Sequence, residues 1–127
     1  MNKILVVDDE PSICHLLRSV LSTQQCRVDT AGAVFDALNK LEACTYDLAI
    51  VDLFLPGIDG LQLAEAIRLL DPGTPVILMT AYGTPSFEAM ASHPAISKYL
   101  HKPFTLDHVE ALVSQCLSPV ATASPSV

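Results

Sequence analysis

The chain has 127 residues, of which 50% are hydrophobic and 17% are charged, a composition that suits one domain with a packed core. The net charge of -7 at pH 7 argues against nucleic-acid binding by this domain. The four cysteines show no CxxC spacing, which favours free thiols and a cytoplasmic setting, and the sequence predicts neither a signal peptide nor a membrane-spanning segment.

Apolar runs typical of buried strands alternate with helical patterns along the first half of the chain. Strands are predicted at residues 4–7, 27–30 and 48–52. Helices are predicted from Pro11, which suits a first helical turn, from about residue 33 to 43, and from near Gly60. Their expected apolar faces are Ile13, Leu16, Leu17, Val20 and Leu21; Val34, Ala37, Leu38 and Leu41; and Leu63, Ile67 and Leu70.

The second half of the chain repeats this order twice. Strands are predicted at residues 76–79 and 95–100, with a short helix between them that opens at Pro85 and stops at Pro94. The last helix carries Leu106, Val109, Leu112, Val113 and Cys116, and Cys116, like Cys14 on the first helix, is expected to be a buried structural thiol. Residues 118–127 are uncharged and rich in Ser, Pro and Ala, so we expect a domain over 1–117 and a linker or disordered tail.

Five strand–helix repeats predict an α/β fold, a doubly wound five-stranded parallel sheet with helices on both faces. Right-handed crossovers would bring the carboxyl ends of all strands to one edge of that sheet. The groups expected at this edge are Asp8, Asp9 and Glu10 after the first strand, Asp52 after the third, Thr80 after the fourth and Lys102 after the fifth. Several carboxylates at one edge repel each other unless a cation joins them, and oxygen ligands alone select a hard cation such as Mg²⁺.

A carboxylate, a magnesium ion, a lysine and a hydroxyl together make a phosphoryl-transfer site with Asp52 as the nucleophile. Lys102 would supply a mobile point charge for phosphoryl oxygens, and Thr80 a hydroxyl donor. Glu10 is interpreted only as a helix cap, because it sits at the positive end of the first helix.

In this order the motifs resemble the receiver domain of two-component response regulators. The matching segments are Val6-Val7-Asp8-Asp9-Glu10, the continuous stretch from Val51 to Gly60, Met79-Thr80-Ala81 and Lys102-Pro103-Phe104. The resemblance covers about residues 2–117. It implies the flavodoxin-like (βα)5 fold with strand order 2-1-3-4-5.

By that resemblance, Asp52 accepts a phosphoryl group from the phosphohistidine of a sensor histidine kinase or a histidine phosphotransfer domain. Asp9 and Asp52 would bind Mg²⁺, or Mn²⁺ in its place, directly with the backbone carbonyl of Phe54. Asp8 would act mainly through a metal-bound water.

The resemblance also assigns the residues that respond to the phosphoryl group. Lys102 would bridge to Asp52 and then to the phosphoryl group, and the Lys102–Pro103 peptide bond would be cis. Thr80 would move to bond a phosphoryl oxygen, and Tyr99 would swing inward behind it.

The family's biology follows as an expectation. The domain would catalyse its own aspartyl phosphorylation and dephosphorylation but act mainly as a switch. Its output would be a C-terminal effector domain of the transcription-activating kind, or another partner. A phosphorylation-dependent homodimer is a further expectation. Pro94-Ala95 departs from the Gly-Ala that receivers usually carry before the fifth strand, within the family's usual output surface. Phe54 and Tyr82, two residues after Asp52 and Thr80, would overhang the path of the water that removes the phosphoryl group.

Two alternatives remain open. A haloacid-dehalogenase-like phosphatase also uses a strand-end aspartate with Mg²⁺, but it needs a second acid two residues later, where this chain has Phe54. An unphosphorylated pseudo-receiver, a pure interaction module, would normally have lost Asp9, Asp52 or Lys102, and all three are present.

Overall fold

A computed structural model describes residues 1–81 and 93–117 of the chain. Its strands are β1 (Asn2–Val7), β2 (Cys26–Ala31), β3 (Leu48–Asp52), β4 (Val76–Ala81) and β5 (Lys98–Lys102). Its helices are α1 (Pro11–Leu21), α2 (Val34–Ala43), α3 (Gly60–Leu70) and α5 (Leu106–Leu117). The fourth helix of the sequence prediction, Tyr82 and the predicted tail lie outside the described residues.

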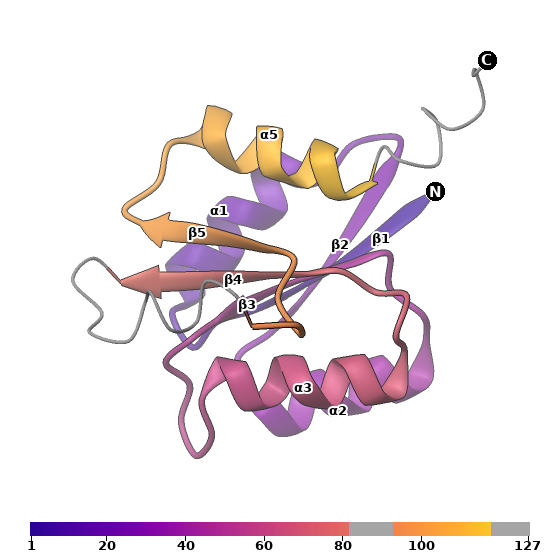
Figure 1. The fold of residues 1–127 in the computed structure, drawn as a ribbon. Coiled ribbons are helices and arrows are strands. Elements are labelled where there is room, and N and C mark those ends of the chain that lie inside the picture. The colour runs from indigo at the N-terminus through magenta and orange to yellow at the C-terminus, as the bar shows by residue number, and fades with distance from the viewer. Residues whose placement is uncertain (82–92, 118–127) are drawn as a thin grey trace.

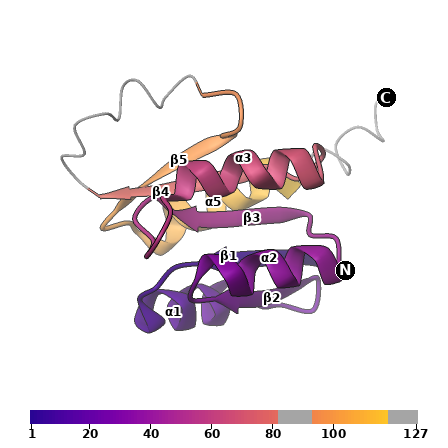
Figure 2. The same ribbon diagram turned by 90° about the horizontal axis from the view of Figure 1, so that it is seen from below.

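The strands form one parallel sheet in the order β2-β1-β3-β4-β5, which Figure 2 shows from below. Helices α1 and α5 cover one face of this sheet, and α2 and α3 cover the other (Figure 1). The predicted fold class and strand order are therefore confirmed. All strands run the same way, so their carboxyl ends meet at one edge.

The strands are hydrophobic without interruption because both faces of the sheet are buried. In β1, Leu5 and Val7 pack in the cluster under α2 and α3, whereas Ile4 and Val6 pack in the cluster under α1 and α5. Successive side chains of a strand point to opposite faces, so a run with no polar position fills both clusters. The first polar side chain of such a run lies where the strand leaves the core.

Three leucines predicted on apolar helix faces, Leu16, Leu70 and Leu106, are exposed, and this part of the sequence interpretation was wrong. Leu16 lies on α1 one position before Leu17, and the sheet-facing residues of that helix are Cys14, Leu17 and Leu21. Leu70 ends α3 a turn beyond Ile67, the last buried residue of that helix. A one-residue step turns a helical side chain by about 100°, so Leu16 faces away from the sheet.

The prediction that β5 starts at residue 95 was also wrong, because residues 95 and 96 belong to a turn and the chain bends at residue 97. The N–H of Ile96 donates to the carbonyl of His93 (3.1 Å), and β5 starts at Lys98. The His93 ring also organises this turn: Nδ1 accepts from the N–H of Ala95 (3.1 Å), and Nε2 lies 3.1 Å from Glu65 Oε2 on α3. The turn thus holds Pro94-Ala95 where receivers usually have Gly-Ala.

The four cysteines are free thiols. Cys14 is buried, as predicted, whereas Cys116 is only half-buried at the end of α5. Burial and the nearby charge of Asp8 raise the pKa of the Cys14 thiol. Among the described helices, none has the length and hydropathy to cross a membrane.

Candidate functional site

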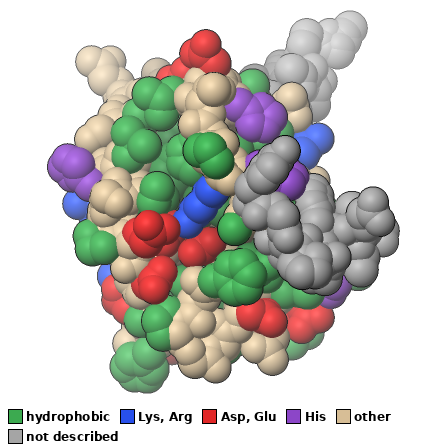
Figure 3. Space-filling model, turned by 90° about the vertical axis from the view of Figure 1, so that its left-hand side faces the viewer, with side chains coloured by type: hydrophobic (Ala, Val, Ile, Leu, Met, Phe, Trp, Pro, Cys, Tyr) green, Lys and Arg blue, Asp and Glu red, His purple; other side chains and the backbone are tan. Residues whose placement is uncertain are grey.

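The strand register places the site carboxylates side by side at the carboxyl edge of the sheet. Val7 of β1 is level with Val51 of β3. The residues that follow them, Asp8 and Asp52, therefore lie side by side at the carboxyl edge of the sheet. Figure 3 looks onto this edge, where acidic side chains gather around a basic one. The arrangement follows from two apolar runs of matched length that each end in an aspartate.

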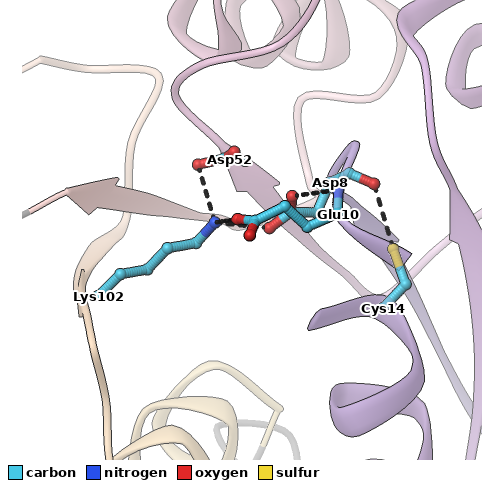
Figure 4. Close-up of polar contacts among 5 residues, drawn as sticks. All are labelled: Asp8, Glu10, Cys14, Asp52 and Lys102. Atoms are coloured by element: carbon cyan, nitrogen blue, oxygen red, sulfur yellow. Dashed lines mark hydrogen bonds and ion pairs between the residues drawn. The ribbon is translucent and has the colours of Figure 1, made fainter. Parts of the chain in front are cut away.

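Asp8 is fully buried, and each of its polar groups has a partner. Its N–H donates to the Ala31 carbonyl (3.1 Å), and its carboxylate Oδ1 accepts from the N–H of Glu10 (2.9 Å). Oδ2 accepts from Lys102 Nζ (2.7 Å), and the carbonyl accepts from the Cys14 thiol (3.3 Å; Figure 4). Asp8 is therefore held rigidly at the centre of the site.

Asp52 is the last residue of β3 and is buried. Burial, and then the negative charge of Asp8, raise the pKa of its carboxyl from 3.8 to about 6, against the opposing effect of Lys102. The carboxylate therefore lies in surroundings that oppose its negative charge until a cation or another positive group balances it.

Lys102 ends β5 and reaches three carboxylates. Its Nζ lies 2.7 Å from Asp8 Oδ2, 3.2 Å from Glu10 Oε1 and 3.4 Å from Asp52 Oδ1 (Figure 4). Burial alone would lower the pKa of the ammonium, but the hydrogen bond to Asp8 and the surrounding carboxylates raise it. Lys102 is therefore a protonated cation at neutral pH. The Lys102–Pro103 peptide bond is cis, as the resemblance implied.

The contact between Glu10 and Lys102 is the feature that sequence reasoning missed. Glu10 occupies the N-cap position of α1, but its side chain makes no capping hydrogen bond. It reaches Lys102 from across the sheet edge instead. The interpretation of Glu10 as only a cap was wrong, and the available signal was its position directly after Asp8-Asp9, in the turn that faces the end of β5.

A carboxylate cluster suited to a metal ion lies beside Lys102. Oxygens of Asp8, Asp9 and Asp52 all lie within 4.8 Å of one another, and Asp9 is the exposed member. Three hard oxygen donors fit Mg²⁺ and leave room for further oxygen ligands. Phe54, whose carbonyl the resemblance adds to this set, lies two residues after Asp52 with its side chain 58% exposed.

The two predicted switch residues lie on the neighbouring strands. Thr80 of β4 is fully buried, and its Oγ1 finds no hydrogen-bond partner among the described residues. Tyr99 of β5 is half-buried and packs against the cluster under α2 and α3. Burial raises the pKa of the Tyr99 hydroxyl, with the His93 backbone acting in the opposite direction.

The segment from Asp52 to α3 is fixed by its own turn chemistry. Gly57 takes a positive φ of 89°, and Asp59 caps α3 in a reciprocal arrangement with Gln62. Gly60 lies against the strand end, where its N–H donates to the Leu53 carbonyl (2.6 Å). A side chain at Gly60 would overlap the Asp52 carbonyl.

Comparison with known proteins gives consistent matches. The family model described as the response regulator receiver domain matches residues 4–114. The transcriptional regulatory protein TcrA of Mycobacterium tuberculosis is 35% identical over 109 residues, which are 86% of this chain and 43% of TcrA. ResD of Bacillus subtilis is 34% identical over 122 residues, which are 96% of this chain and 50% of ResD. The chain thus spans half or less of these curated relatives.

Solved structures match over nearly the whole chain. The response regulator TrrA of Thermotoga maritima, solved in complex with Mg²⁺-BeF, is 37% identical with a TM-score of 0.81 and covers 92% of this chain and 100% of its own. A CheY-like receiver domain protein of Methanospirillum hungatei has a TM-score of 0.87 at 24% identity, covers 98% of this chain and 99% of its own, and supports the fold alone.

Proposed function

The chain belongs to the family of response regulator receiver domains, and on this premise we propose that Asp52 accepts a phosphoryl group from a phosphohistidine. One observation carries the proposal: Asp52 is a buried strand-end carboxylate 3.4 Å from Lys102 Nζ and next to a carboxylate cluster that fits a divalent cation. Asp8 shares these surroundings, but both of its carboxylate oxygens already accept hydrogen bonds, from the N–H of Glu10 and from Lys102 Nζ.

The transfer is a displacement at phosphorus. A carboxylate oxygen of Asp52 forms the new P–O bond as the P–N bond of the phosphohistidine breaks, and the imidazole nitrogen leaves with the electron pair and is then protonated. Lys102, protonated and held at the site, neutralises charge on the phosphoryl oxygens. Thr80, whose buried hydroxyl finds no described partner, would donate to one of these oxygens.

We propose Asp9, Asp52 and the Phe54 carbonyl as the direct ligands of Mg²⁺, with Mn²⁺ as a substitute. The support is the donor set, three carboxylates with oxygens within 4.8 Å, and the Mg²⁺-BeF complex of TrrA. Asp8 is engaged by Glu10 and Lys102 and would act indirectly. When bound, the cation would supply charge neutralisation for the phosphoryl oxygens.

The partners are part of the same proposal. A sensor histidine kinase or a histidine phosphotransfer domain would supply the phosphoryl group. TcrA and ResD are named as transcriptional regulatory proteins, and each is at least twice as long as the matched region, so we propose an effector domain as the output. Phosphorylation would control that output through Thr80 and Tyr99, with homodimerisation as one route.

Mapping the acyl phosphate tests the proposal. The domain is incubated with Mg²⁺ and acetyl phosphate, the product is trapped with borohydride, and the modified residue is identified by mass spectrometry. We expect label at Asp52 in the wild type and none in Asp52→Asn, with Asp59→Asn, a change in the same loop, labelled like the wild type. If neither acetyl phosphate nor a phosphorylated kinase labels the protein, the pseudo-receiver alternative is favoured.

A further inference from the structure

The ammonium of Lys102 donates to two carboxylates and forms an ion pair with a third. A lysine ammonium carries three N–H bonds and no acceptor. In this structure Nζ faces three carboxylates, those of Asp8 at 2.7 Å, Glu10 at 3.2 Å and Asp52 at 3.4 Å (Figure 4). A phosphoryl oxygen that arrives at the site therefore competes with these carboxylates for the ammonium of Lys102.

Burial decides which partner leaves. The Asp8 side chain is fully buried, and it is also held by the N–H of Glu10. Asp52 is buried and is the residue that carries the phosphoryl group. The Glu10 side chain is 59% exposed, so water can solvate its carboxylate once it leaves Lys102, whereas a released Asp8 carboxylate would stay buried without a counter-charge.

We propose that Glu10 is a positioning residue that occupies the donor position of Lys102 taken by an incoming phosphoryl oxygen, and thereby lowers the affinity of the site for phosphoryl groups. This inference rests on the proposed function of Asp52. It gives the exposed third acid of the Asp8-Asp9-Glu10 motif a role distinct from metal binding and from helix capping.

Three substitutions separate the contact of Glu10 from its charge. Glu10→Asp keeps the charge but is one methylene shorter, Glu10→Gln keeps the reach but loses the charge, and Glu10→Ala loses both. Beryllofluoride, the phosphoryl mimic, is titrated into each protein at saturating Mg²⁺, and binding is followed by ¹⁹F NMR. Exposed ion pairs are weak, so we expect Glu10→Asp and Glu10→Ala to bind beryllofluoride about two- to fivefold more tightly than the wild type, with Glu10→Gln in between.

The ¹⁵N resonance of the Lys102 ammonium reports the contact independently of binding. It should shift in beryllofluoride-free Glu10→Asp as it does in Glu10→Ala, which a change in overall stability would not produce. Glu65→Gln, which removes an exposed carboxylate on α3 that pairs with His93, is the matched charge control and should bind like the wild type.

The outcomes separate the two proposals. If Glu10→Asp binds beryllofluoride like the wild type while Glu10→Gln and Glu10→Ala both bind more tightly, the effect is general charge and the inference is overturned. Unchanged affinity in all three variants overturns it as well. If the wild type itself neither binds beryllofluoride nor is labelled at Asp52, the proposed function has failed, and the contact of Glu10 is a resting-state ion pair only.

Discussion

At the scale of single residues, burial and the nearby charge of Asp8 raise the pKa of Asp52. A carboxyl with an ordinary pKa in the unfolded chain and a raised one in the fold binds a proton more tightly when folded. Stability conferred by the neutral form is therefore lost as pH rises from about 4 to about 6, the raised pKa of Asp52. At neutral pH the metal-free domain has lost all of this stability, because Asp52 is then ionised in its buried position.

Asp52→Asn should therefore stabilise the metal-free domain at pH 7. At 1.36 kcal/mol per pH unit, the raised pKa of Asp52 corresponds to a gain of up to about 3 kcal/mol. Urea unfolding in EDTA at pH 7 and at pH 3.5 measures this gain, which should disappear at the lower pH because both side chains are then neutral. Glu42→Gln, an exposed carboxylate on α2, is the control. A gain at pH 3.5 equal to that at pH 7 would mean that packing, not charge, is responsible.

The sequence showed which residues meet at the edge, but not how each is used there. Asp8, Asp52 and Lys102 could be placed together because each ends a strand of a parallel sheet. The contact of Glu10 with Lys102 could not, because Glu10 precedes a helix and local propensity favours a cap at that position. The side chain forms a long-range ion pair with Lys102 instead, and the position of Glu10 directly after Asp8-Asp9 is the one sequence signal for it.

At the scale of elements, the approach of α3 to β3 sets the position of Asp52, the proposed phosphoacceptor. Gly60 starts α3 directly against the end of β3, and a Cβ there would overlap the Asp52 carbonyl and lie 2.9 Å from Leu53 Cα. Backbone, not a flexible side chain, blocks that space. The glycine therefore couples the first turn of the helix to the position of Asp52.

Gly60→Ala should destabilise the domain by roughly 2 kcal/mol, because the strand end must shift to make room for the methyl group. It should also reduce the rate of Asp52 labelling at saturating acetyl phosphate. Gly73→Ala is the matched control, since its Cβ would meet only Asp71 Oδ1 at an ordinary 3.6 Å. Urea unfolding and labelling kinetics measure both effects. If Gly60→Ala is labelled as fast as the wild type, the close approach of Gly60 to Asp52 is not needed for phosphorylation.

The helices and the central strands could be predicted because each has a strong local pattern. The start of β5 could not, because residues 95 and 96 are buried and apolar like strand residues and yet belong to a turn. That turn depends on His93, whose ring bonds to Ala95 and Glu65. Interactions of this kind join α3 to the turn, and they carry no periodic signal in the sequence.

Phosphorylation should act on β4 and β5 as a shift between two populations of one fold. Thr80 has a buried hydroxyl with no described partner, and Tyr99 lies on the adjacent strand, so both can respond to a new acceptor beside Asp52. Beryllofluoride with Mg²⁺ should perturb the amide resonances of Thr80, Ala81 and residues 93–104 more than those of β2 and α2. In Thr80→Ala the changes at residues 93–104 should shrink, and changes limited to the neighbourhood of Asp52 in the wild type would contradict the switch.

At the scale of the whole molecule, one carboxylate cluster links the charge state of the domain to its stability. The chain carries a net charge of -7, and part of that charge is concentrated in Asp8, Asp9 and Asp52 at one edge of the sheet. The hydrophobic clusters on the two sheet faces hold these groups together against their repulsion. A cation that binds only the folded cluster therefore stabilises every element at once.

Mg²⁺ should raise the melting temperature of the wild type, and Asp9→Asn should remove that response. At a Mg²⁺ concentration a hundred times the dissociation constant, binding contributes about 2.7 kcal/mol, which corresponds to roughly 10 °C for a domain of this size. Without Mg²⁺ the order of the melting temperatures reverses, because Asp9→Asn relieves repulsion among the carboxylates and should melt above the wild type. Glu10→Gln should keep the full Mg²⁺ response, since Glu10 contacts Lys102 and is not part of the cluster. Thermal melts of the three proteins across a Mg²⁺ series measure this crossing, and an undiminished response in Asp9→Asn would remove Asp9 from the metal site.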